Sequence, residues 1–238
     1  MWYDNLSTSS SWASLWSGYI LCGDCLGIRR IDKTCPGCGA PPPSLEPREL
    51  QLEEGRRLTV PAVFAGAEGR YEDYVYLQML QREWERPAPE FERFAHFPEH
   101  ERPSARAALV LLFWSYFETR LERLLRGGMR LLPGSVTEDL LDRYSSVGAR
   151  LYRLYRVAFG RTYFEDLTAL GHGRVATLLV ELHKRRNEFA HGRPQAIDDA
   201  TVATLVEALK DEHESWIAVF NLRAVKSRGS DPGPERSE

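Results

Sequence analysis

From residue 104 to about residue 223 the chain places apolar side chains every three or four positions, which is the period of an amphipathic helix. The first such run begins at Ser104, a favourable N-cap residue, and ends at the glycine pair 127–128. Its apolar residues fall on one face, at positions 110, 113, 114, 117, 121, 124 and 125. The pattern predicts a helix over residues 104–128.

Three more helical runs follow the first. Residues 135–138 have the Ser-x-x-Glu sequence of a capping box and predict a second helix, which continues to Gly160. A third helix is expected over 174–191, and a fourth begins near 198–199. Four amphipathic helices with mostly short connections predict a mainly α protein, an up-and-down four-helix bundle.

The first 103 residues contain shorter elements. Short strands are expected at 18–21 and 58–64, and a helix at 71–86. Trp2, Trp12 and Trp16 are expected to pack onto the neighbouring cysteine-rich module or onto a partner. The predicted organisation is an N-terminal arm and cysteine-rich module at 1–43, a mixed connector at 44–103 that packs on the main domain, the helical bundle at 104–223 and a disordered tail at 224–238.

Composition narrows the function classes. The formal net charge of −3 and the pI near 6.1 argue against binding of nucleic acid through the overall charge of the protein, so any phosphate-binding surface has to be local. The longest apolar run, residues 107–114, is much shorter than the roughly 18 to 20 residues that cross a bilayer. The N-terminus lacks a basic segment followed by an apolar one. We therefore expect a cytoplasmic protein without a membrane span.

All four cysteines lie in one short window. Cys22 and Cys25 form one C-x-x-C pair, and Cys35 and Cys38 form a second pair, with nine residues between the two pairs. Two residues between thiolates let a tight turn direct both sulfurs at one ion, and two such turns supply the tetrahedral sulfur set that Zn²⁺ prefers. The spacing resembles that of zinc ribbons over residues 17–40.

Other uses of these cysteines are a pair of structural disulfides or a redox-active C-x-x-C. The paired spacing in a chain expected to be cytoplasmic favours Zn²⁺ over both. Four thiolates leave no open coordination position, so the expected role of one Zn²⁺ per chain is structural and not catalytic.

A local basic segment at 183–193 carries the candidate chemistry. It contains four Lys or Arg side chains, Lys184, Arg185, Arg186 and Arg193, against one Glu. Asn187 and His191 are four residues apart and share a helix face, whereas Arg186 must bend round the helix to meet the histidine. A solvated basic helix end that only complements the helix dipole is the alternative interpretation.

The sequence Arg186-Asn187-x-x-x-His191 resembles the R-N-x-x-x-H signature of the HEPN superfamily, and the resemblance covers residues 104–223. Members of that family are helical bundles, commonly dimers, and many are metal-independent endoribonucleases in toxin, antiphage and RNA-processing systems. The resemblance implies that Arg186 and His191 are the catalytic pair and that Asn187 orients them. It also implies RNA as the substrate, a homodimer, and an antitoxin or defence-system partner.

These residue types suit metal-free RNA cleavage, in which the ribose 2′-hydroxyl attacks the adjacent phosphate. His191 can move a proton, and Arg186 can donate hydrogen bonds to the charged phosphate oxygens of the transition state. Lys184, Arg185 and Arg193 are candidates for binding the substrate backbone. If two protomers bring these helix ends together, one histidine can accept a proton while its twin donates one. The expected products carry a 2′,3′-cyclic phosphate and a 5′-hydroxyl.

Several other residues have two interpretations. A looser Arg-to-His spacing at 93–100 contains a proline and lacks the asparagine, so it is discounted. Glu118 is either an extra acidic residue of the site or a surface carboxylate near Arg120 and Arg123. His213 lies on an apolar stripe and is expected to be a packed core histidine. A noncatalytic HEPN-like module that binds RNA or protein and is recruited through the zinc ribbon is the alternative function.

Overall fold

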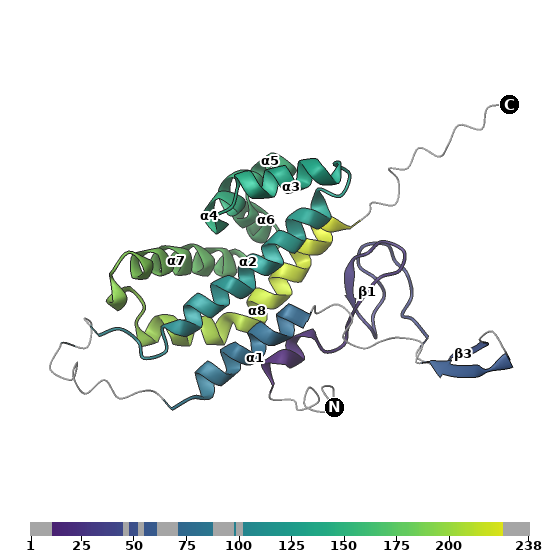
Figure 1. The fold of residues 1–238 in the computed structure, drawn as a ribbon, viewed down its shortest axis with the longest axis horizontal. Helices are drawn as coiled ribbons and strands as arrows, with labels where there is room; N and C mark the ends of the chain where they lie inside the picture. Colours follow the sequence, from purple (N-terminus) through teal and green to yellow (C-terminus); the bar gives the residue numbers. More distant parts are fainter. Residues whose placement is uncertain are drawn as a thin grey trace.

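The computed structural model describes residues 11–44, 48–51, 55–60, 71–87, 98 and 102–225, which fold as a mainly helical protein (Figure 1). The mainly α prediction is therefore confirmed. Trp2, the Arg93 and His100 of the second Arg-to-His spacing, and nearly all of the predicted tail lie outside the described residues. Within the described part of the chain, no helix combines the length and the apolarity needed to cross a membrane.

Helices α2 (Ala108–Gly128) and α8 (Asp199–Ala224) lie side by side at the centre of the molecule. Near their N-terminal ends, the Ser104 hydroxyl donates to the carboxylate of Asp199 at 2.5 Å. At the other end the helices approach closely, because a Cβ added to Gly127 would lie 2.9 Å from the Cβ of Ala224. The two helices therefore run parallel, unlike the first and last helices of an up-and-down four-helix bundle.

A buried ion pair joins these two helices. The guanidinium of Arg120 donates from Nη2 to both carboxylate oxygens of Glu212, at 2.8 and 2.6 Å, and both side chains are inaccessible to solvent. The guanidinium also lies 3.8 Å from the ring centroid of Tyr116 and 5.4 Å from that of Trp216. Charge, hydrogen bonding and aromatic packing thus fix the contact between α2 and α8.

The N-terminal part of the chain packs on the same two helices. Helix α1 (Tyr71–Glu85) lies along α2, where Arg123 donates to the buried carboxylate of Asp73 at 2.8 Å. The 3-10 turn η1 (Trp12–Trp16) inserts the fully buried ring of Trp16 against Trp216, with ring centroids 5.9 Å apart. Trp16 is therefore part of the main hydrophobic core.

The predicted second helix is wrong, because the chain forms several helices in its place. These are α3 (Gly134–Arg143), α4 (Val147–Ala149), the π-helical turn η5 (Arg150–Leu154) and α5 (Tyr155–Phe159), which ends at Gly160 as expected. Pro133 precedes the first of them, so Ser135 lies inside α3 and caps nothing. The chain then breaks at Tyr144, and Ser146 caps the next helix by accepting from the Ala149 amide at 3.2 Å.

Helix α6 (Tyr163–Ala169) is an additional element that the apolar pattern did not predict. It begins with a capping box, the motif that had been expected at 135–138 and is absent there. Thr162 accepts from the Glu165 amide, and the Glu165 carboxylate accepts from the Thr162 amide. Asp166 is fully buried and accepts two 2.6 Å hydrogen bonds from Arg223 near the C-terminal end of α8. This pair attaches α6 to the central helices.

The last two predicted helices are confirmed. Helix α7 (Gly173–Ala190) packs against α6 and α8, has His191 as its C-cap, and is followed by the short turn η6 (Pro194–Ala196). Asp198 caps α8 by accepting from the Thr201 amide at 2.8 Å. The first predicted helix ends where expected but begins four residues late, because Ser104 starts a separate turn before α2.

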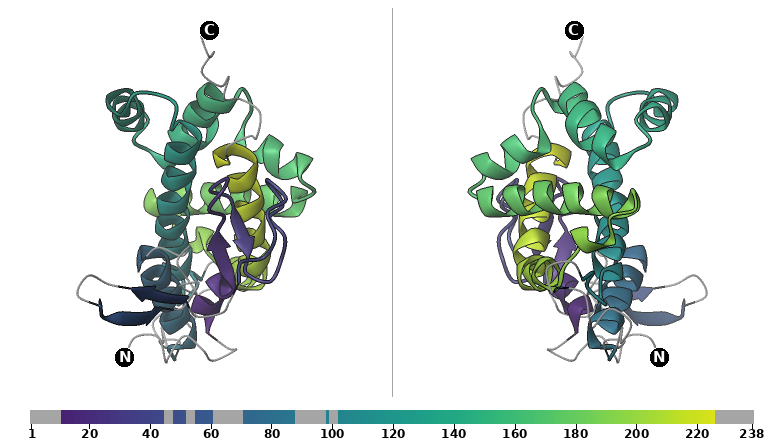
Figure 2. Two further views of the ribbon diagram at one scale, coloured as in Figure 1. Left: turned by 90° about the vertical axis from the view of Figure 1, so that its right-hand side faces the viewer. Right: turned by 90° about the vertical axis from the view of Figure 1, so that its left-hand side faces the viewer.

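Two small antiparallel sheets complete the described chain (Figure 2). Strand β1 (Tyr19–Leu21) pairs with β2 (Ile28–Arg30), and β3 (Arg48–Gln51) pairs with β4 (Arg57–Val60). The strand predicted at 58–64 is thus found in its first half, and 61–64 lies outside the described residues.

Replacing Arg120 with methionine should lower the free energy of unfolding by about 3–5 kcal/mol, because it leaves the carboxylate of Glu212 buried and unpaired. The double variant Arg120→Met with Glu212→Leu removes both charges and should recover most of the loss. Urea denaturation monitored by circular dichroism measures both. Arg143→Gln, which breaks only the exposed pair with Asp139, is the control and should change stability by less than about 1 kcal/mol. If Arg120→Met were as stable as wild type, the role of the ion pair between Arg120 and Glu212 in stabilising the fold would be contradicted.

Candidate functional site at the end of helix α7

The C-terminal half of α7 borders a hollow of about 580 Å³. Residues four positions apart lie about 40° apart around a helix, so His183, Asn187 and His191 share one face. All three side chains line this hollow. Its wall is completed by Tyr152, Val180, Lys184, Glu188 and Arg193. The structure therefore brings two of the three signature residues, Asn187 and His191, together.

Arg186 lines a different hollow, of about 330 Å³, on the α2 side of the helix. It lies five residues from His191, which is about 140° around the helix axis. Glu118 and Arg186 line the same hollow. Within one chain the motif is thus divided between two adjacent hollows.

Asn187 connects the two sides of the helix. Its Oδ1 accepts a hydrogen bond of 3.1 Å from Nη1 of Arg186. Its Nδ2 lies 3.4 Å from Nε2 of His183. The amide therefore contacts both the arginine of one hollow and a histidine of the other.

The three predicted substrate-binding residues separate into two groups. Lys184 and Arg193 are exposed and line the hollow that contains His191. Arg185 points elsewhere: it donates to Glu181 at 2.8 Å and to the carbonyl of Ala196 at 3.1 Å. Arg185 thus ties η6 to α7.

Sequence reasoning missed His183 and Tyr152 as members of this hollow. Tyr152 reaches it from the π-helical turn η5, and Trp114 reaches the His183 ring from α2, with ring centroids 5.3 Å apart. The spacing of four residues between 183, 187 and 191 could have placed His183 on this face. Nothing in the local pattern signals Tyr152, because its place depends on how η5 packs against α7.

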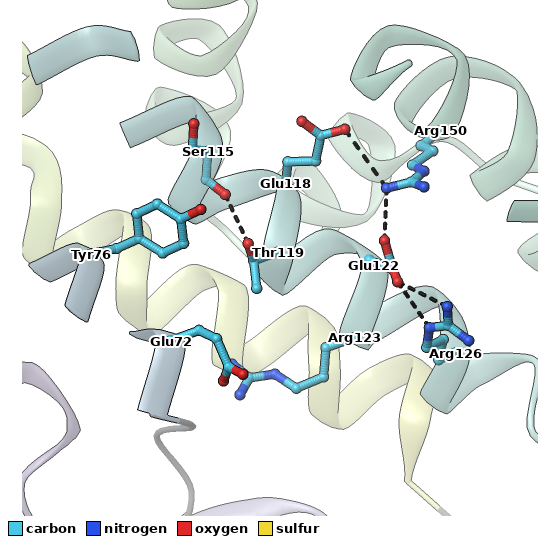
Figure 3. A pocket seen from close by; sticks show the side chains of 9 residues that line it. All are labelled: Glu72, Tyr76, Ser115, Glu118, Thr119, Glu122, Arg123, Arg126 and Arg150. Atoms are coloured by element: carbon cyan, nitrogen blue, oxygen red, sulfur yellow. Dashed lines mark hydrogen bonds and ion pairs between the residues drawn. The ribbon is translucent and has the colours of Figure 1, made fainter. Parts of the chain in front are cut away.

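A cleft of about 420 Å³ lies on the other side of Glu118 (Figure 3). Arg150 stands between two carboxylates there, 3.0 Å from Glu122 and 3.7 Å from Glu118. The expected neighbours Arg120 and Arg123 do not pair with Glu118, because they are bound to the buried acids Glu212 and Asp73. Glu118 is therefore a half-exposed carboxylate between the charge of Arg150 and the hollow of Arg186.

The four cysteine sulfurs form a second candidate site, with all four within 4.8 Å of one another. The sulfurs of Cys22 and Cys38 lie 3.5 Å apart, as do those of Cys25 and Cys35. A disulfide requires about 2.05 Å, so none of the four cysteines forms one with another and the disulfide interpretation does not hold.

The two cysteine pairs have the same local backbone geometry. The amide of the residue after each pair, Leu26 or Gly39, donates at 2.9 Å to the carbonyl of the first cysteine, Cys22 or Cys35. Both residues have positive φ, 62° and 73°. A left-handed conformation costs a leucine about 1 kcal/mol, and it turns the chain back so that both thiols of a pair face the same point.

The electrostatics of the cluster call for a cation. Burial raises the pKa of the Cys22 thiol, but the backbone amides of Cys25 and Asp24 and the side chains of Cys38 and Cys35 together outweigh it and bring that pKa to about 7. Burial raises the pKa of Cys25 to about 12. Four sulfurs this close repel one another when ionised, so a set of four thiolates is stable only around a positive ion. The residues present therefore fit a metal that prefers tetrahedral sulfur ligands.

The cysteine module is held against the end of α8. The side-chain amide of Asn221 accepts from the Ile28 amide and donates to the Ile28 carbonyl, both at 2.7 Å. Val225 packs on the cysteines, and a Cβ added to Gly27 would lie 2.9 Å from its Cγ2. The glycine thus allows a close approach between the module and the helix.

No family model matches this chain, and no match appears among curated proteins or among solved structures. The arguments about its function therefore depend on the residues and their geometry.

The expectation that His213 is a core residue agrees with its burial. Its ring is 1% exposed and lies 4.6 Å from the Trp16 ring centroid, edge to face. Burial, followed by the charge of Arg120, lowers the pKa of His213 to about 3, although the Leu15 backbone opposes this. His213 is neutral at physiological pH and lies outside the candidate site.

His213→Phe should make the protein less sensitive to acid. The pKa of His213 falls from an ordinary 6.5 to about 3 on folding, so between these values the unfolded chain binds more protons. Its contribution to stability is complete above pH 6.5 and is lost as the pH falls, by up to ~1.4 kcal/mol per pH unit. Urea denaturation at pH 7 and pH 5 should show a smaller loss for His213→Phe than for wild type. His172→Gln, in the turn before α7, is the control, and equal losses in all three proteins would refute the prediction.

Proposed function

We propose that this protein is a metal-independent endoribonuclease of the HEPN type, with Arg186, Asn187 and His191 in its active site. The observation that carries the proposal is the exposed end of α7, where His191, Lys184 and Arg193 border one open hollow and Asn187 is hydrogen-bonded to Arg186. A local cationic hollow of this kind suits a phosphodiester even though the whole chain is acidic.

The chemistry follows from what each side chain can donate or accept. His191 moves a proton to or from a ribose or leaving oxygen. Arg186 offers five N–H donors, of which the bond to Asn187 uses one, and the others suit the oxygens of a pentacoordinate phosphate. Lys184 and Arg193 hold adjacent phosphates. Glu118 lines the same hollow as Arg186.

A homodimer would unite the two hollows. In one chain Arg186 and His191 lie about 140° apart around α7. If two copies meet at this helix end, Arg186 of one chain can bind the oxygens of a phosphate whose cleavage His191 of the other chain assists by moving a proton. The resemblance to HEPN proteins, which are commonly dimers, favours the same arrangement, and by that resemblance alone the setting is a toxin or antiphage system with a controlling partner.

Purified protein should cut RNA in the presence of EDTA, and Arg186→Ala and His191→Ala should each slow the cutting by at least ~100-fold. The fragments should carry 2′,3′-cyclic phosphate and 5′-hydroxyl ends, measured by end-labelling and mass spectrometry. Arg143→Gln and His172→Gln remove an arginine and a histidine far from the hollow and should cut at the wild-type rate. Equal cutting by every variant would indicate a contaminating nuclease and would contradict the proposal.

A noncatalytic module that binds RNA or protein is the second candidate. The separation of Arg186 and His191 into two hollows favours it, because a single chain does not direct both groups at one phosphate. In that case RNA should bind and lose affinity in Lys184→Ala and Arg193→Ala, without cleavage by any variant. The cysteine module, fixed on α8 by Asn221, would then be a recruitment surface.

We also propose that the cysteine cluster binds one structural Zn²⁺ per chain, as in zinc ribbons. The support is the set of four cysteine sulfurs, not joined by disulfides, that lie within 4.8 Å of one another on two equivalent turns. Bound Zn²⁺ would link the two turns by four thiolates and would hold them in place against α8.

Metal analysis of the purified chain should find about one zinc per molecule, and Cys25→Ser should lose most of it and unfold at a lower temperature. Because ligation needs thiolates, acidification should release the metal and the stability that it confers. Asp24→Asn, an exposed change between the same two ligands, is the control and should keep the metal. Metal-free protein with native stability would refute the assignment.

A further inference from the structure

The orientation of the Asn187 amide is determined by its two neighbours. A guanidinium can only donate hydrogen bonds, so the atom that faces Nη1 of Arg186 at 3.1 Å has to be the carbonyl oxygen. The amide nitrogen then faces Nε2 of His183, at 3.4 Å. An amide NH₂ group also only donates, so Nε2 of His183 is an acceptor and carries no proton. The neutral ring has its proton on Nδ1.

The surroundings of His183 favour the same state. The half-buried ring lies between Trp114 and Tyr152, with ring centroids at 5.3 and 6.2 Å. Burial, and then the positive charge of Arg186, lowers the pKa of His183. A Cβ added to Gly148 of α4 would lie 3.3 Å from Cε1 of the ring, so the imidazole has little room to turn.

The charged and titratable groups around this ring come from α7, the turn after it, η5 and α2. Helix α7 contributes Lys184, Arg186, Glu188 and His191, the turn after it contributes Arg193, and η5 contributes the Tyr152 phenol. Helix α2 contributes Glu118, which lines the hollow on the Arg186 side. The cations outnumber the carboxylates, which is consistent with a neutral histidine.

We propose that His183 is a further residue of this site, a neutral imidazole whose Nε2 is held as a proton acceptor by Arg186 through the side-chain amide of Asn187. Arg186 and Asn187 are positioning residues in this arrangement. Its catalytic part rests on the proposed ribonuclease function, whereas the hydrogen-bond relay does not.

In RNA cleavage the two histidines of the hollow take opposite roles. Nε2 of His183 accepts the proton of the ribose 2′-hydroxyl while the 2′-oxygen forms its bond to phosphorus. The bond from phosphorus to the 5′-oxygen breaks, and protonated His191 gives its proton to that oxygen. The 3.4 Å contact with Asn187 is long for a hydrogen bond, so a substrate hydroxyl can replace it. A single chain then holds both the base and the acid.

Histidine NMR on the full-length chain tests the relay without any substrate. The chain has six histidines, and His183→Gln identifies the resonances of His183. Wild type should show the Nδ1–H tautomer at pH 7.5 and a pKa below the ordinary 6.5. Arg186→Met removes the repulsion and should raise that pKa, and Asn187→Asp should raise it further because a carboxylate favours the imidazolium. Asn187→Leu should free the tautomer, while Arg143→Gln should change nothing.

A proton on Nε2 in wild type, or a pKa of His183 that is the same in wild type and Arg186→Met, would overturn the relay. Circular dichroism confirms that each variant is folded.

The pH dependence of RNA cleavage tests the catalytic part. The acidic limb of kcat/KM should follow the pKa of His183 and should move to higher pH in Arg186→Met. His183→Gln should lower kcat by at least ~100-fold and leave KM nearly unchanged. If His183→Gln cuts as fast as wild type, His183 is not the base. If wild type itself cuts no RNA, the ribonuclease proposal and the catalytic role of His183 both fail, and the NMR result still decides the relay.

Discussion

The contact between α2 and α8 depends on one charge buried with its counter-charge. Arg120 and Glu212 are both excluded from water, so each is stable there only while the other is in place. The neighbouring arginines of the same two helices extend the principle: Arg123 binds an acid of α1, and Arg223 binds an acid of α6. The surrounding helices are thus attached to the central pair by directed bonds in addition to apolar packing.

Much of this fold could be predicted from the periodicity of the sequence, because α7, α8 and the end of α2 are long and have strong end signals. The region 135–158 could not, because its apolar positions keep their helical spacing across a break at Tyr144. The capping sequence at 135–138 was also misleading, because α3 begins after Pro133 and Ser135 lies inside that helix. The contact between α2 and α8 contains the buried charges of Arg120 and Glu212, and a pattern of hydrophobic positions treats such residues as surface.

The candidate site was predictable in part for a similar reason. The asparagine and histidine of the motif share a helix face by simple geometry, and the cysteines meet because each pair makes its own turn. His183, by contrast, is recognised only when the hydrogen bonds of Asn187 and the rings of Trp114 and Tyr152 are known. The π-helical turn that delivers Tyr152 has no signature in the sequence, since it arises from packing between helices.

The double hydrogen bond between Asn221 and Ile28 has a mechanical consequence. The side-chain amide takes the place that a neighbouring peptide unit would occupy beside β2, so the helix serves the small sheet as a substitute third strand. The cysteine module is therefore attached to α8 by hydrogen bonds and not only through the chain that connects them. Any molecule bound to the surface of the module would therefore have one fixed orientation relative to the helices.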